Sequence, residues 1–129
     1  MKKNNINPGT QLEIIGHRGY SAVAPENTIA SLNSAIATGV RSVEFDIHIS
    51  SCGTPVLFHD DNLHRTTNGF GPLKCKTFRQ LQDLDAGKWF SEEFSGEKIP
   101  SLMEAINQLN GQIDYIYVEV KGIRKLQDI

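Results

Sequence analysis

The sequence lacks any long apolar run. No stretch of its 129 residues approaches the roughly 18–20 consecutive apolar residues needed to cross a membrane. Residues 1–5 are polar and basic and lead into another polar segment, where a signal peptide would place an apolar stretch. We therefore expect a cytoplasmic protein with no membrane span.

Cysteine is scarce, and neither sign of charge is in large excess. Cys52 and Cys75 show neither the spacing of a metal-ligand pair nor the density of a disulfide scaffold, so both are expected to be free thiols. The 13 Lys and Arg residues against 15 Asp and Glu residues give a net charge of −2, spread along the chain. Because no basic stripe is available to displace counterions from a polyanion, nucleic acid is not expected as a partner.

Internal repeats and low-complexity tracts are also absent, and the length fits a single domain with one core. Residues 1–11 form a polar lead-in, and 12–129 are expected to form the domain. From about 60 to 100 the sequence is polar and rich in turns, with one short helix predicted at 77–84. We expect the segment of about 60–100 to be a small insertion module outside the main scaffold.

The rest of the chain alternates between strand and helix patterns. Short apolar or alternating runs predict strands, and apolar residues at helical spacing predict helices. Strands are expected at 12–16, 43–49, 55–59 and 115–121, and helices at 28–38 and 101–109. Strands that are separated by helices and end in polar residues predict a parallel α/β sheet or a barrel of the (β/α)8 type, whose active sites lie at the C-terminal ends of the strands.

The two central strands are joined by a turn that is too short to contain a helix. If these strands pair as an antiparallel hairpin that turns at Cys52, Phe58 lies opposite Asp46. His59 would then return close to the acidic side chains of the longer strand.

Three acidic residues occupy matching positions on two predicted strands. Glu44 and Asp46 are two residues apart, so their side chains leave the same face with Cα atoms about 6.6–6.8 Å apart. Glu119 has the corresponding place on the last strand. Carboxylates at this spacing can converge on one hard cation at bonds of about 2.0–2.6 Å. The alternation by itself also fits solvent-facing positions of an ordinary half-exposed sheet.

Two histidines and two basic residues accompany these carboxylates. His17 follows the first strand and His59 ends the hairpin, and imidazoles that titrate near neutrality are suited to act as acid and base in phosphodiester cleavage. Arg18 and Lys121 add the fixed positive charge that a phosphate with developing negative charge requires. The same two residues could instead simply neutralise the carboxylates.

Together these residues resemble the glycerophosphodiester phosphodiesterase family. Seven short motifs occur in the order and spacing of that family, which argues against a chance match, and the resemblance covers essentially all of residues 13–122. The motifs are His17-Arg18-Gly19, Pro25-Glu26-Asn27-Thr28, Glu44-Phe45-Asp46, Phe58-His59-Asp60, Arg65-Thr66-Thr67, Gly96-Glu97-Lys98-Ile99-Pro100-Ser101-Leu102 and Glu119-Val120-Lys121.

The resemblance implies a (β/α)8 barrel that hydrolyses glycerophosphodiesters to glycerol phosphate and an alcohol with Mg²⁺ or Ca²⁺. A complete barrel runs to about 200–250 residues, so the chain is expected to form a partial TIM-type barrel, its N-terminal half. The segment of about 60–100 resembles the family's small inserted module, which covers the substrate. The family commonly has an acidic residue at the position of Cys52, and this difference in a turn is expected to have little effect on the chemistry.

The resemblance also implies a role for each of nine residues. It assigns metal binding to Glu44, Asp46 and Glu119, general acid and base catalysis to His17 and His59, phosphate binding to Arg18 and Lys121, and bracing of the site to Glu26 and Asn27.

Two other interpretations stay open. The chain could be a truncated, non-catalytic remnant that binds a metal or phosphate or self-associates, since an unclosed barrel has open edges. It could also be a related phosphodiesterase that acts on phospholipid head groups. Ile99-Pro100 and Arg65-Thr66-Thr67 favour the glycerophosphodiester substrate over the head-group alternative.

Overall fold

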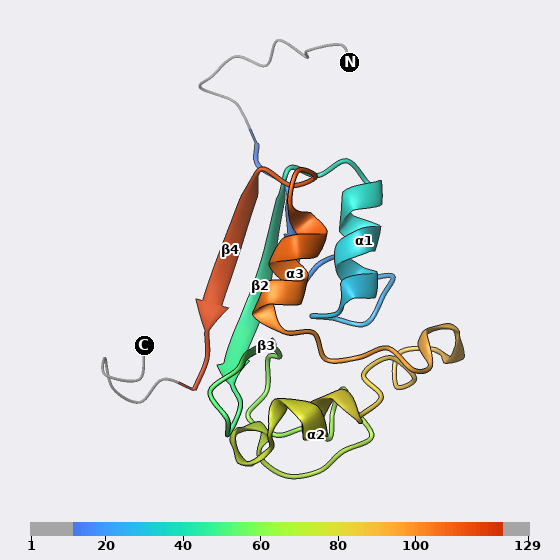
Figure 1. The fold of residues 1–129 in the computed structure, drawn as a ribbon. Helices are drawn as coiled ribbons and strands as arrows, with labels where there is room; N and C mark the ends of the chain where they lie inside the picture. The colour runs from blue at the N-terminus through green and yellow to red at the C-terminus, as the bar shows by residue number, and fades with distance from the viewer. Residues whose placement is uncertain (1–11, 123–129) are drawn as a thin grey trace.

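The computed structural model of the protein describes residues 12–122, so the predicted lead-in and the last residues of the predicted domain lie outside the described part (Figure 1). The elements in chain order are β1 (Ile15–His17), α1 (Ile29–Ala37), β2 (Ser42–Ile49), β3 (Pro55–Leu57), the 3-10 helix η2 (Leu73–Cys75), α2 (Phe78–Gln82), the 3-10 helix η3 (Glu92–Phe94), α3 (Leu102–Leu109) and β4 (Tyr115–Val120). Every predicted strand and helix is present, although β1, β3 and α2 are shorter than predicted. Among the described residues, no helix has the length and apolar character to cross a membrane.

The sheet is built around β2, the longest strand. β1 and β4 both pair with β2 in parallel, and β3 pairs with it antiparallel. Ile47 pairs with Val120 of β4 and also with Leu57 of β3, so β3 lies on the same side of β2 as β1. The parallel part of the open sheet therefore contains three strands within the described residues, and β3 is a hairpin extension at the C-terminal end of β2.

The hairpin register that the sequence predicts is confirmed. Ile47 faces Leu57 and His48 faces Val56, and the N–H of Phe58 donates to the carbonyl of Asp46 at 3.0 Å. This pairing brings the chain that follows β3 back along the C-terminal half of β2, so that His59 lies at the same end of the sheet as Asp46.

The main core lies between the sheet and the two helices α1 and α3, which cover the same face (Figure 1). β2 supplies the sheet side of this core because its odd-numbered residues point to that face. The fully buried members are the apolar side chains Leu32, Ala35, Val43, Phe45, Leu57, Ala105 and Leu109. Thr28 and Ser101 cap the two helices, since their hydroxyls accept hydrogen bonds from the backbone N–H of the third residue of the helix. Packing on one face leaves the other face of β2 free for polar side chains.

A second, smaller core lies in the segment predicted to be an insertion. Loops, η2 and α2 wrap around buried apolar residues that extend from β3 to Ile99. These residues are Val56, Phe58, Leu63, Leu73, Leu81, Ala86 and Ile99. Figure 1 shows this part at the C-terminal end of β2. The separate core supports a distinct module, whose boundaries stay a prediction.

Candidate active site

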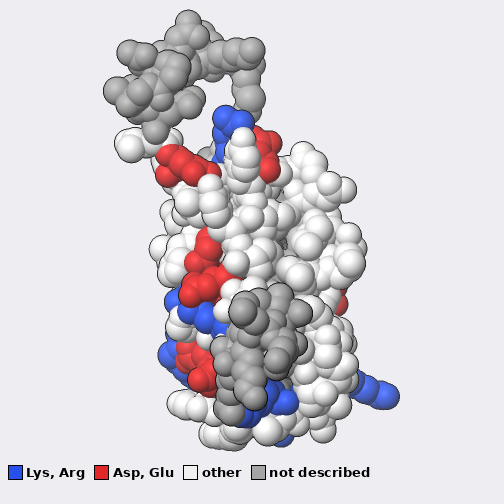
Figure 2. Space-filling view, turned by 90° about the vertical axis from the view of Figure 1, so that its left-hand side faces the viewer, with Lys and Arg blue, Asp and Glu red and all other residues white. Residues whose placement is uncertain are grey.

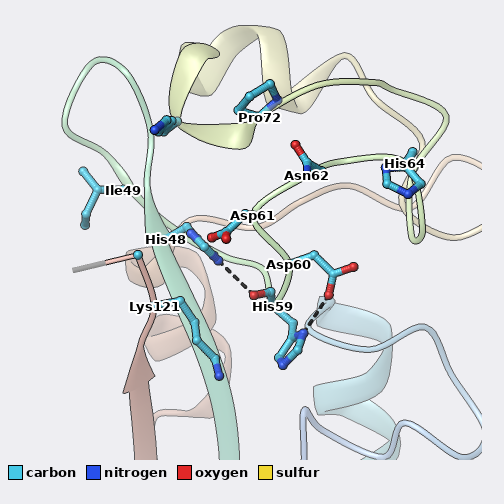
Figure 3. A pocket seen from close by; sticks show the side chains of 11 residues that line it. His48, Ile49, His59, Asp60, Asp61, Asn62, His64, Pro72 and Lys121 are labelled. Carbon is cyan, nitrogen blue, oxygen red and sulfur yellow. Dashed lines mark hydrogen bonds and ion pairs between the residues drawn. The ribbon is translucent and has the colours of Figure 1, made fainter. Parts of the chain in front are cut away.

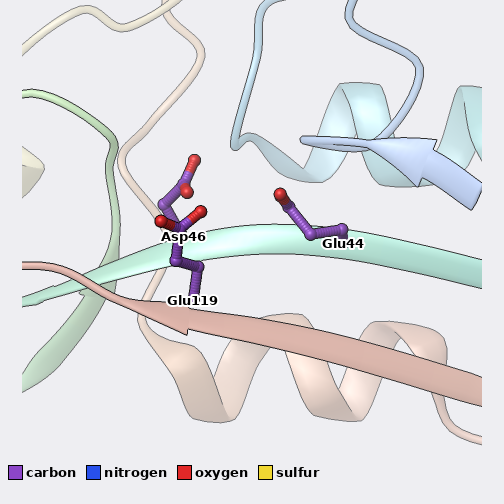
Figure 4. Close-up of side chains that lie close together, drawn as sticks. All are labelled: Glu44, Asp46 and Glu119. Atoms are coloured by element: carbon purple, nitrogen blue, oxygen red, sulfur yellow. The ribbon is translucent and has the colours of Figure 1, made fainter.

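Glu44, Asp46 and Glu119 converge on the sheet face opposite α1 and α3 (Figure 4). Glu44 and Asp46 leave β2 on one face, and Asp46 is in register with Glu119 of β4. One carboxylate oxygen from each residue lies within 4.8 Å of the other two. The parallel pairing of β2 with β4 therefore brings together carboxylates that are far apart in sequence.

This cluster fits a divalent cation. Asp46 is only 1% exposed, and Asp46 Oδ1 and Glu44 Oε1 are buried without a hydrogen-bond partner. Burial, reinforced by the nearby charge of Asp46, raises the pKa of Glu44. Carboxylate oxygens are ligands that Mg²⁺ and Ca²⁺ prefer. A buried oxygen without a hydrogen-bond partner calls for such a ligand-bound ion or another explanation. A cation at this position would supply the missing partner of both oxygens.

Asn27 holds Asp46 in place. Its side-chain amide donates to Asp46 Oδ2 at 3.0 Å, and its carbonyl oxygen accepts the backbone N–H of Asp46 at 3.1 Å. Asn27 adopts the left-handed conformation with φ 57°, as Arg18 does with φ 53°, and the backbone N–H of Asn27 donates to the carbonyl of Arg18. The side chain of Asn27 thus uses both of its polar ends on one residue, the amide on the carboxylate and the carbonyl oxygen on the backbone of Asp46.

His17 and Arg18 reach the cluster from the end of β1. His17 Nε2 lies 3.8 Å from Glu44 Oε2, and the side chain of His17 is 63% exposed. Arg18 Nη1 donates to Glu26 Oε2 at 2.9 Å, while Arg18 Nε lies 3.2 Å from Asp46 Oδ2. Gly19 follows with φ 81°, and a side chain there would overlap Ser31 of α1, so this turn requires glycine.

Lys121 approaches from the opposite side, directly after β4. Its Nζ donates to Glu119 Oε1 at 2.7 Å and lies 4.0 Å from Asp46 Oδ1. The hydrogen bond lowers the pKa of Glu119 and raises that of Lys121. Asp46 therefore lies between two basic side chains, Arg18 after β1 and Lys121 after β4.

His59 follows β3 on the β1 side of β2. Its Nδ1 lies 2.7 Å from Asp60 Oδ1, and its backbone carbonyl accepts a hydrogen bond from His48 Nε2 at 2.9 Å. His59 and Lys121 both line a cleft of about 1090 Å³ that extends along the loop after β3 to His64 (Figure 3). This cleft offers space for a small molecule next to the second imidazole.

The charged groups are mixed over this side of the molecule. Figure 2, which faces the β4 side of Figure 1, shows acidic and basic side chains next to one another beside a broad uncharged surface. An anionic ligand that also binds a cation needs both signs of charge at one place.

Sequence reasoning gave no role to Asp60, Arg65 or His48, although each contacts a predicted site residue. Asp60 and Arg65 belong to motifs that carried the family resemblance. The signal for His48 was its place on the same strand face as Glu44 and Asp46.

Comparison with known proteins gives the family. The model of the glycerophosphoryl diester phosphodiesterase family matches residues 17–128. The glycerophosphodiester phosphodiesterase of Caldanaerobacter subterraneus is 39% identical over 109 residues, 84% of this chain and 45% of its own. Glycerophosphodiester phosphodiesterase 1 of Homo sapiens is 40% identical over 119 residues, 91% of this chain and 36% of its own.

A solved structure of a phosphodiesterase is also similar to this chain. The Oleispira antarctica phosphodiesterase in complex with the product sn-glycerol-3-phosphate superimposes with a TM-score of 0.83 and 44% identity, over 85% of this chain and 44% of that chain. The fold is a partial α/β unit of the TIM-barrel proteins, and the chain belongs to the glycerophosphoryl diester phosphodiesterase family. It spans less than half the length of these three relatives.

Proposed function

We propose that this protein is a divalent-cation-dependent phosphodiesterase that cleaves glycerophosphodiesters to glycerol 3-phosphate and an alcohol, in lipid and glycerol phosphodiester metabolism. The observation that carries this proposal is the convergence of three carboxylates from β2 and β4, two of them with unpaired buried oxygens, between Arg18 and Lys121. The names of the relatives and the sn-glycerol-3-phosphate bound to the Oleispira protein support this substrate class.

In this proposal Glu44, Asp46 and Glu119 hold one Mg²⁺ or Ca²⁺. When bound, the cation supplies Lewis-acid polarisation of a phosphoryl oxygen. Arg18 and Lys121, which flank Asp46, bind the remaining phosphate oxygens and stabilise their growing negative charge. Glu26 and Asn27 brace Arg18 and Asp46 through the hydrogen bonds described above.

In this proposal the imidazoles of His17 and His59 transfer the protons. One takes the proton of the attacking hydroxyl, which is either water or the glycerol hydroxyl of the substrate, and the other gives a proton to the oxygen of the departing alcohol. His17 and His59 both lie on the β1 side of β2, and the cleft beside His59 has space for the alcohol group.

The test is release of glycerol phosphate from glycerophosphocholine by this chain, with Mg²⁺, with Ca²⁺ and with a chelator. We expect release with one or both cations and none with the chelator. Thermal melting checks the site independently, because a cation at 100 times its Kd stabilises the fold by about 2.7 kcal/mol. Melting shifted by the cation without product release would favour the non-catalytic remnant, and cleavage of sphingomyelin or a phosphoinositide instead would favour the head-group alternative.

We also propose that the chain self-associates through its open edges. All six residues of β4 are exposed, and Ile116, Val118 and Val120 leave apolar side chains on the face that the helices cover elsewhere. Exposed strand edges with apolar neighbours pair readily with another chain. Light scattering should give a mass above that of one chain, and Val118→Lys should lower this mass. A monomer at all concentrations would contradict the proposal.

A cytoplasmic location stays a prediction from the sequence.

A further inference from the structure

Arg65 connects two acidic side chains of the site. One edge of its guanidinium forms a bidentate pair with Glu26: Nη1 donates to Oε1 and Nη2 donates to Oε2, both at 2.9 Å. With the other edge it donates from Nε to Asp60 Oδ2 at 2.8 Å and from Nη2 to Asp60 Oδ1 at 2.9 Å. Asp60 Oδ1 is also the atom that contacts His59 Nδ1. Arg65 therefore holds the carboxylate of Asp60 in place, and Asp60 in turn holds the ring of His59.

The same network reaches the carboxylate cluster. Glu26 accepts from Arg18 as well as from Arg65, and Arg18 contacts Asp46. Burial opposes ionisation of Glu26, but the pairs with Arg65 and Arg18 outweigh it and lower its pKa. An unbroken series of ion pairs and hydrogen bonds thus runs from Asp46 to His59.

Asp60 determines which nitrogen of His59 carries the hydrogen. The hydrogen bonds from Arg65, followed by the contact with His59, hold the pKa of Asp60 well below its usual range. An ionised carboxylate accepts hydrogen bonds and cannot donate, so the hydrogen must be on Nδ1. Figure 3 shows the other ring nitrogen turned away from Asp60, on the side of Lys121. Nε2 is then the nitrogen that can exchange a proton with a ligand.

The backbone of His59 is fixed separately. His48 is only 5% exposed, lies edge-on to Phe58, and donates from Nε2 to the carbonyl of His59 at 2.9 Å. With the backbone held by β2 and the ring held by Asp60, little freedom remains at the His59 side chain.

We propose that Asp60 and Arg65 are positioning residues for proton transfer: they fix the His59 ring with hydrogen on Nδ1 and leave Nε2 to the substrate. The role of His59 in the reaction rests on the proposed function, whereas the tautomer and its cause do not. Arg65 is suited to this task because its planar guanidinium donates two hydrogen bonds to each of two carboxylates, four in all, whereas the ammonium of lysine has only three hydrogens and no planar fork. The side chain of Arg65 is 43% exposed, and the geometry of its ion pairs is the feature to test.

The test is the ¹⁵N NMR signature of the histidine rings, which reports the tautomer of each histidine directly. In the unmodified chain His59 should carry hydrogen on Nδ1. Asp60→Asn and Arg65→Lys should both shift His59 toward hydrogen on Nε2, while the signals of His17 stay unchanged. Arg41→Lys is the matched control, because Arg41 makes a similar ion pair with Asp114 away from the site and is 72% exposed.

Kinetics supply the second readout. Asp60→Asn and Arg65→Lys should lower kcat for glycerophosphocholine about 10–100-fold with little change in KM, as expected when an orienting partner of a histidine is removed. Hydrogen on Nε2 of His59 in the unmodified chain overturns the proposal, and so does a tautomer shift that leaves kcat unchanged. If the unmodified chain releases no product while the Nδ1 tautomer depends on Asp60, the proposed function fails and the positioning stands.

Discussion

Asp46→Asn is expected to remove the cation-induced rise in melting temperature and to reduce turnover roughly 10³-fold or more. Asp46 is the central carboxylate of the cluster, since it pairs in register with Glu119 and contacts Arg18, Lys121 and Asn27. Asparagine keeps the shape but removes the negative charge, so the cation loses a ligand while Arg18 and Lys121 lose their shared counter-charge. Calorimetric titration with Mg²⁺ and Ca²⁺ measures the change.

Asp114→Asn is the matched control for this variant. Asp114 is an exposed carboxylate that pairs with Arg41 at 2.6 Å, near the N-terminal end of β4. Its removal should leave both cation binding and turnover unchanged. Cation binding by Asp46→Asn equal to that of the unmodified chain would overturn the assignment of the metal site.

His17→Ala and His59→Ala should each lower kcat by about 10²–10⁴-fold, the usual contribution of general acid–base catalysis. Neither ring belongs to a core, because the side chains of His17 and His59 are 63% and 32% exposed. The melting temperature should therefore stay close to that of the unmodified chain. Turnover near normal in either variant contradicts the role of that histidine.

A second substrate can show which histidine acts as the general acid and which as the general base. Bis(p-nitrophenyl) phosphate has a leaving group that needs no proton, so loss of the general acid should affect its cleavage much less than that of glycerophosphocholine. Loss of the general base should affect both substrates. If both variants lose activity equally on both substrates, the proposal that one of His17 and His59 is the general acid and the other the general base is wrong.

The strand and helix patterns predicted most of the fold because they are local. The alternation of residues 43–49 marked one apolar face, and Val43, Phe45 and Ile47 are buried on it. The hairpin register followed from the length of its turn, and the structure has the predicted pairing. The lengths of β1 and β3 could not be read from composition, because they depend on where the backbone of β2 offers a partner.

For the site, the residue types could be read from the sequence, and their roles were predicted from the family resemblance. The structure brings Glu44, Asp46 and Glu119 together, with Arg18 and Lys121 on either side of Asp46. Their catalytic and binding roles stay predictions until the variants are measured. The forked grip of Arg65 on Glu26 and Asp60 had no signal in spacing, because it joins loops that follow different strands.

The sequence by itself determined which residues alternate, which cap the helices and which carry acid, base or charge, because these properties depend on neighbours within a few positions along the chain. Only the tertiary structure decided which of these groups meet. Pairing of β4 with β2 places Glu119 beside Asp46, and the left-handed turn at Asn27 brings its amide to the same carboxylate. Such contacts depend on strand register and backbone direction across long separations, which no local pattern encodes.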